Sequence, residues 1–245
     1  MLSSVWKSSS LHKSAILKLL VIISLCIPLS NDAIAGITAF DAVATVKKPV
    51  KLMALTKGRF FSEGGKLVEF HIDEKHIGTT LSGGDGYAFL KYTPQSKGLK
   101  KIKLTLAEEF TEAMLLVTDK KDRIILIAIE AGLFESTLSF KPAKGAKEAI
   151  DTITKKFRII YLTSIIGIMQ SKKWLQDNNL HESIVFSWTG NNLIEDLRGK
   201  DINIFAIIGS AEMLADIEDI RKFSFKETDD GTEVESWSDI LKKLQ

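Results

Sequence analysis

The hydrophobic pattern of this 245-residue chain changes part-way along, and the change limits the folds available to it. In the second half, short apolar runs of the kind found in strands buried on both faces occur at 124–129, 158–162, 183–186 and 203–208. Segments with helical spacing separate them, at 145–157, 170–178 and 191–198. Buried strands that alternate with helices predict a Rossmann-like α/β domain with a parallel sheet.

The first half has a different period. Lys66–Asp73 (KLVEFHID) alternates apolar and polar residues, and glycine-rich turns such as Ser82–Gly86 recur at intervals. Short strands spaced in this way predict an all-β sandwich. We therefore expect two domains: a sandwich over 36–110 and an α/β domain over 111–245, with Asp119–Asp122 as a hairpin-like turn near the start of the second.

The strand-rich half carries a set of short motifs in a recognisable order. They are Ile77-Gly78-Thr79, Asp85-Gly86 and Tyr92-Thr93-Pro94, followed by a closing strand at 102–106. In this order they resemble a bacterial immunoglobulin-like domain. The resemblance implies a spacer or adhesion module without chemistry of its own.

Residues 1–35 have the layout of a secretory signal peptide. Lys7, Lys13 and Lys18 precede an apolar stretch at 19–29, and Ala33-Ile34-Ala35 forms a small-residue pattern before Gly36. We predict cleavage between Ala35 and Gly36 and a periplasmic or secreted protein. An uncleaved membrane anchor is the alternative. After cleavage we expect no stable membrane insertion, because no later apolar segment reaches transmembrane length.

Charge and cysteine content exclude several classes of function. Removing residues 1–35 takes away three lysines and one aspartate, which leaves basic and acidic residues in equal number. This balance argues against a nucleic-acid partner. The one cysteine, Cys26, falls within the predicted leader. The remaining chain therefore has no disulfide, catalytic thiolate or cysteine metal site.

In parallel α/β folds, ligands bind where the strands end at their carboxyl termini. The apolar runs end in Ala128-Ile129-Glu130, Thr163-Ser164 and Gly209-Ser210. With the segment FRIIYLTS…KKWLQDNNL, this layout resembles the haloacid dehalogenase (HAD) superfamily of phosphatases, and in particular its lipin-type bacterial branch, over roughly 112–245.

The resemblance implies a role for each matched position. Ala128 stands where the family has its nucleophilic aspartate, and Glu130 where it has the acid/base aspartate. Thr163 keeps the hydroxyl that binds phosphate. Ser210 and Leu214 occupy the positions of two magnesium-binding aspartates, and the helix that begins near residue 191 lacks the family's lysine.

Chemistry decides what these replacements mean. Alanine cannot form an aspartyl-phosphate, and magnesium needs several hard oxygen ligands. A general acid such as Glu130 contributes about 10²–10⁴-fold, whereas phosphate-monoester hydrolysis can require on the order of 10²¹-fold. We therefore expect a pseudoenzyme with no catalytic residue, no metal and no cofactor, which acts as a binding or scaffolding module.

Its partner is left open between an envelope protein and a small anionic or phosphorylated ligand. Such a ligand would be held by Glu130, Thr163, Ser164, Gly209 and Ser210. Backbone N–H groups after Thr163 could cradle the anion, unless Thr163 and Ser164 simply cap the next helix.

Two other functions stay open. One is an active, magnesium-dependent phosphohydrolase with a rearranged site around Glu130, Asp119 or Glu212; in a different register, Asp119 and Asp122 would form its acidic pair. The other is a purely structural envelope module.

Elsewhere, His71 and His76 flank a turn and could bind a metal, although a surface position explains them better. Trp188 could line a cleft.

Overall fold

The computed structural model describes residues 36–58, 61–136 and 139–244. The predicted signal peptide lies outside these residues, so its cleavage and the export of the chain stay predictions. Within the described ranges, no helix is both long enough and apolar enough to cross a membrane.

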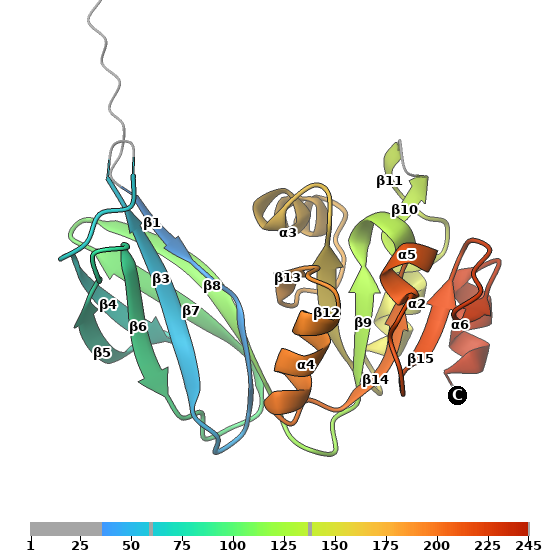
Figure 1. Cartoon of the computed structure of the whole chain (residues 1–245), viewed down its shortest axis with the longest axis horizontal. Helices are drawn as coiled ribbons and strands as arrows, with labels where there is room; N and C mark the ends of the chain where they lie inside the picture. The colour runs from blue at the N-terminus through green and yellow to red at the C-terminus, as the bar shows by residue number, and fades with distance from the viewer. Residues whose placement is uncertain (1–35, 59–60, 137–138, 245) are drawn as a thin grey trace, which may run out of the picture. The chain divides into compact units, whose positions relative to one another are not determined.

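In the first part of the described chain, residues 36–118, strands β1 to β8 form two sheets (Figure 1). The smaller sheet has the order β1-β3-β6, with bounds β1 Gly36–Ala39, β3 Val50–Lys57 and β6 Tyr87–Tyr92. The larger has the order β2-β8-β7-β4-β5, with bounds β2 Ala42–Thr45, β4 Leu67–Ile72, β5 Lys75–Leu81, β7 Gly98–Leu106 and β8 Glu109–Thr118. Their neighbours pair antiparallel except β2 and β8, which are parallel.

The alternation of buried and exposed side chains along the strands explains why the two sheets form a sandwich. Every second residue of β3 is buried, and Leu52 packs with Phe70, Leu104 and Leu115 of the other sheet in one apolar cluster. Strands β3 and β4 thus each bury one face, as the period-two pattern predicts.

The boundary expected between residues 110 and 111 falls inside β8, and this correction has a clear cause. Residues 111–117 pair antiparallel with β7, and residues 115–118 pair with β2 on the other side. Leu115 and Val117 point into the core of the sandwich. The sandwich therefore continues to Thr118, and the turn at 119–122 connects the two regions.

The α/β region is built on a six-stranded, fully parallel sheet with the order β13-β12-β9-β14-β15-β16. The strands are β9 Ile124–Ala128, β12 Arg158–Thr163, β13 Val185–Ser187, β14 Ile204–Ile208, β15 Arg221–Ser224 and β16 Thr232–Glu233. Its helices are α2 Ala146–Ile153, α3 Ile168–Asp177, α4 Asn191–Gly199, α5 Ala211–Leu214 and α6 Trp237–Lys243. Between β9 and α2 come a single π-helical turn, η1 Ile129–Leu133, and the hairpin β10 Phe134–Ser136 with β11 Ser139–Pro142.

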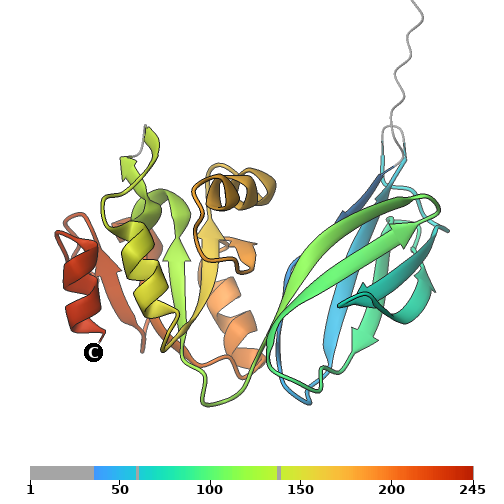
Figure 2. The same cartoon turned by 180° about the vertical axis from the view of Figure 1, so that it is seen from behind.

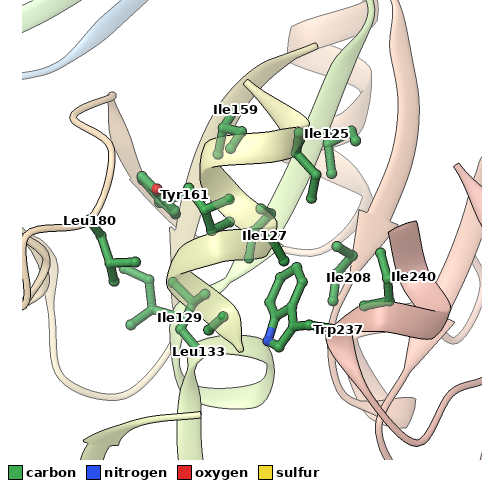
Figure 3. Packing of buried hydrophobic residues seen from close by; sticks show 14 of the residues in the cluster. Ile125, Ile127, Ile129, Leu133, Ile159, Tyr161, Leu180, Ile208, Trp237 and Ile240 are labelled. Carbon is green, nitrogen blue, oxygen red and sulfur yellow. The ribbon is translucent and has the colours of Figure 1, made fainter. Parts of the chain in front are cut away.

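All four predicted strands and the predicted parallel sheet are present in this region. Every residue of β9 is buried, because the sheet is covered on both faces. Helices α2 and α6 pack on the face seen in Figure 2, and α4 and α5 on the other. In Figure 3, Trp237 lies against Ile127 and Ile208, and its indole Nε1–H donates to the carbonyl of Gly132 at 3.1 Å.

One buried carboxylate links the sandwich to the α/β region. Asp41, between β1 and β2, accepts hydrogen bonds from the backbone N–H groups of Met114 and Val185, each at 2.8 Å. The Nζ of Lys172 on α3 donates to the same carboxylate at 2.6 Å. The Asp41 side chain is only 1% exposed.

Candidate functional site

The carboxyl ends of β9, β12, β14 and β15 open onto a pocket of about 660 Å³. After β9 the chain continues outward to β12 and β13 and then returns to the other side of β9 at β14. This switch in direction is the place where open α/β sheets bind ligands. Predicted site residues Glu130, Ser164, Gly209 and Ser210 all line the pocket.

The carboxylate of Glu130 is held by four donors from the end of β12. Its Oε1 accepts from Thr163 Oγ1 at 2.6 Å and from the N–H groups of Ser164, Ile165 and Ile166 at 3.2, 3.0 and 3.2 Å. Three consecutive N–H groups that converge on one oxygen form an anion-binding concavity. Burial raises the pKa of Glu130, but the Thr163 hydroxyl and the backbone N–H groups outweigh it and lower the pKa below its usual value.

The backbone N–H groups after Thr163 do converge on one acceptor, and that acceptor is the internal carboxylate of Glu130. Helix α3 begins at Ile168, and its N-cap residue, Gly167, makes no side-chain capping bond. Thr163 and Ser164 thus lie before the helix and do not cap it. Glu130 and Thr163 are 33 positions apart in the sequence. They meet because Glu130 follows β9, Thr163 ends β12, and these two strands are paired neighbours.

Apolar side chains occupy two positions where the resemblance would place aspartates. Ala128 is 1% exposed and packs with Leu126, Ile160 and Ile207 in the apolar cluster between the sheet and helices α4 and α5. Leu214 is fully buried in the same cluster. Neither residue lines the pocket, so neither position offers it a polar group.

Ser210 is the N-cap residue of α5, and both Ser210 and Glu212 line the pocket. A hydrogen bond from the Ser210 hydroxyl holds the pKa of Glu212 below its usual value, and the nearby ammonium of Lys226 adds to the effect. Glu212 is therefore ionised at neutral pH.

Sequence reasoning missed part of the lining. The exposed side chains of Glu135, Glu235, Lys144 and Lys226 stand around the opening, and Trp237 contributes to the apolar floor. Several of these lie beyond residue 208, where short and polar segments hid β15 and β16 from a search for apolar runs. Across the described ranges, no group of three or more histidine, cysteine or acidic residues is arranged to hold a metal ion.

The alternative acidic pair lies at the wrong end of the sheet. Asp119 and Asp122 precede β9, whereas Glu130 follows it, and five residues of strand span about 16 Å. Both carboxylates contact Lys97, and Asp119 also accepts N–H bonds from its own turn. A site that combines Asp119 with Glu130 is thus not formed.

Two other sequence candidates lie away from the pocket. The rings of His71 and His76 are 5.2 Å apart across β4 and β5, and these residues contact Glu69 and Thr79, respectively. Trp188 packs partly against the cluster that contains Ala128 and does not line the pocket.

Comparisons with known proteins concern about a third of the chain. No protein-family model matches it, and no curated protein is significantly similar. Among solved structures, the D00-D0 domain of intimin is 17% identical, with a TM-score of 0.29, over 34% of this chain and 46% of that one. The CARDB domain of PF1109 from Pyrococcus furiosus is 17% identical, with a TM-score of 0.27, over 34% of this chain and 91% of that one. Fibronectin(III)-like modules of Clostridium thermocellum CbhA are 14% identical, with a TM-score of 0.25, over 34% of this chain and 97% of that one.

The structural matches to intimin and CARDB are immunoglobulin-like or fibronectin-like domains. The strand order and the shared core of its two sheets define the sandwich independently of these matches. No comparison shows a HAD or lipin-type domain, so that part of the sequence resemblance stays a prediction.

Proposed function

We propose that this chain is an exported binding module whose α/β region is a catalytically degenerate relative of HAD phosphatases. The observation that carries the proposal is the position of Glu130. Its carboxylate fills the concavity that Thr163 and the following N–H groups would otherwise offer to an anion.

The surrounding residues support the same conclusion. A phosphoryl-transfer site of this type needs an attacking carboxylate and a divalent ion. The buried Ala128 and Leu214 stand where the resemblance places a nucleophile and a metal ligand. Glu130 keeps a carboxylate at the acid/base position, but its four donors stabilise the ionised form, which has no proton to give to a leaving group.

The pocket beside Glu130 is the proposed binding site. The pocket volume falls in the range of ligand sites, and apolar and charged side chains meet in its lining. The sandwich then serves as a spacer that carries this pocket, as the immunoglobulin-like motifs imply. An inert envelope module is a weaker alternative, because it gives no account of a pocket at the switch point of the sheet.

Hydrolysis of p-nitrophenyl phosphate by purified residues 36–245, with and without magnesium, tests the loss of activity. We expect no turnover above buffer. A Glu130→Gln variant is assayed beside the parent chain, with circular dichroism to confirm folding. Magnesium-dependent turnover that disappears in Glu130→Gln would show an active phosphohydrolase and defeat the proposal.

A further inference from the structure

The pocket combines an apolar floor with an excess of carboxylates at its opening. Three aromatic residues line the pocket: Phe225, which is partly exposed, and Phe134 and Trp237, which are 7% and 2% exposed. Around them stand Glu135, Glu212 and Glu235, all exposed, against only Lys144 and Lys226. The charge of Glu130 adds to this excess from within.

Large apolar side chains extend into solvent beside the same pocket. Ile165, which also lines the pocket, is 71% exposed. Phe140 on β11 is 64% exposed, and its ring packs on that of Phe134 in the lining. We call these two residues the apolar rim. Exposed apolar groups next to a concave site are typical of surfaces that bind other proteins.

The backbone beneath the apolar rim is anchored. Trp174 on α3 donates its indole N–H to the carbonyl of Phe140 at 2.6 Å, which ties the helix to the hairpin. The ring centroid of Phe134 lies 4.8 Å from that of Trp174 and 5.4 Å from that of Phe140. Glu130 holds the N–H of Ile165. An anchored surface loses little conformational freedom when it binds, so its apolar contacts count more fully toward affinity.

We propose that the pocket and the apolar rim dock a short segment of a protein partner, in which an apolar anchor side chain is followed by a lysine or arginine. This inference rests on the proposed binding function. The anchor would bury against the aromatic floor, and the cation would meet Glu212 and Glu235. A bilayer fits less well, because its flat surface cannot fill a concave pocket and anionic lipids would meet excess carboxylates.

Fluorescence polarisation with pools of short labelled peptides tests this chemistry. Every pool fixes one leucine and, two positions later, carries lysine, glutamate or serine, with all other positions randomised alike. We expect saturable binding of the lysine pool that weakens with added salt, because the charges are exposed. No saturation up to about 1 mM, or equal binding of all pools, would overturn the inference.

Charge reversal separates recognition from folding. The double variant Glu212→Lys with Glu235→Lys should switch preference from the lysine pool to the glutamate pool, which a general loss of structure cannot produce. Ile165→Ser should weaken binding of the lysine pool by roughly tenfold. The matched control is Phe110→Ser on β8, since Phe110 is 63% exposed but belongs to the sandwich. Unchanged preference in the double variant, or equal losses in Ile165→Ser and Phe110→Ser, would contradict the docking site.

Vesicles of phosphatidylglycerol and phosphatidylcholine test the alternative that the apolar rim binds a membrane. Sedimentation with these vesicles that Ile165→Ser abolishes, without peptide binding, would assign the apolar rim to a membrane and overturn the peptide inference. Failure of peptide binding leaves the absence of hydrolysis intact, whereas phosphatase turnover would defeat the proposed function itself, so the two failures are distinguishable.

Discussion

The junction at Asp41 and the pocket at Glu130 each hold one carboxylate among backbone N–H donors, but they differ in burial and in charge balance. Asp41 uses both oxygens and has a cationic partner in Lys172. Glu130 receives all four donors on Oε1, and none of them is a cation. An ionised side chain can thus serve as a crosslink between regions in one place and as a substitute for a bound anion in another.

Replacing Asp41 by alanine should produce the largest effect of this comparison. The change leaves Lys172 without its buried partner and two N–H groups without an acceptor, so we expect the free energy of unfolding to fall by about 3 kcal/mol. Urea denaturation measures it. Asp177→Ala is the control, because the Asp177–Lys173 pair is exposed and should contribute below about 0.5 kcal/mol. Equal losses in the two variants would show that the junction does not stabilise the fold.

Replacing Glu130 by alanine should cost less and should open the concavity. We expect a loss of about 2 kcal/mol, because the freed N–H groups lie partly within reach of water. Phosphate or sulfate should then raise the melting temperature of this variant more than that of the parent chain. Glu135→Ala, also in the pocket lining, is the matched control. The idea of an internal anion fails if added oxyanions stabilise all three chains alike.

The contrast also shows what the sequence can and cannot predict. The run at 124–129 predicts β9 because residues 124–128 are uniformly apolar and all buried. The end of β8 looks similar at 114–118 but belongs to the sandwich, since pairing with β7 decides its sheet. A single sequence gives no information about that pairing.

Site prediction was limited in the same way. Strand ends identified Glu130, Thr163 and Ser210 as neighbours at one edge of the sheet. The binding of Glu130 by the loop after Thr163 depends on side-chain direction within the single turn η1, which residue spacing does not encode. Glu235 reaches the pocket through the short strand β16, which has only two residues and no apolar run.

Thr163→Val tests one donor of the concavity by itself. Valine keeps the shape of threonine but removes the hydroxyl that donates to Glu130 at 2.6 Å. Because three N–H donors remain, we expect a loss of about 1 kcal/mol, roughly half that of Glu130→Ala. Double-mutant analysis with Glu130→Ala should show that the two losses are not additive, since both remove the same contact. Additive losses would mean that Thr163 stabilises the fold through other neighbours.

The pH dependence of stability gives the smallest and most specific test. The pKa of Glu130 is lower in the folded chain than its ordinary value of 4.5. Its contribution is therefore complete above the unfolded pKa and is lost as the pH falls through the folded pKa. Urea denaturation of the parent chain and of Glu130→Gln should show a constant difference near neutral pH that shrinks below about pH 4.5. A difference that grows on acidification would show instead that burial outweighs the four donors, and that Glu130 prefers its protonated form in the pocket.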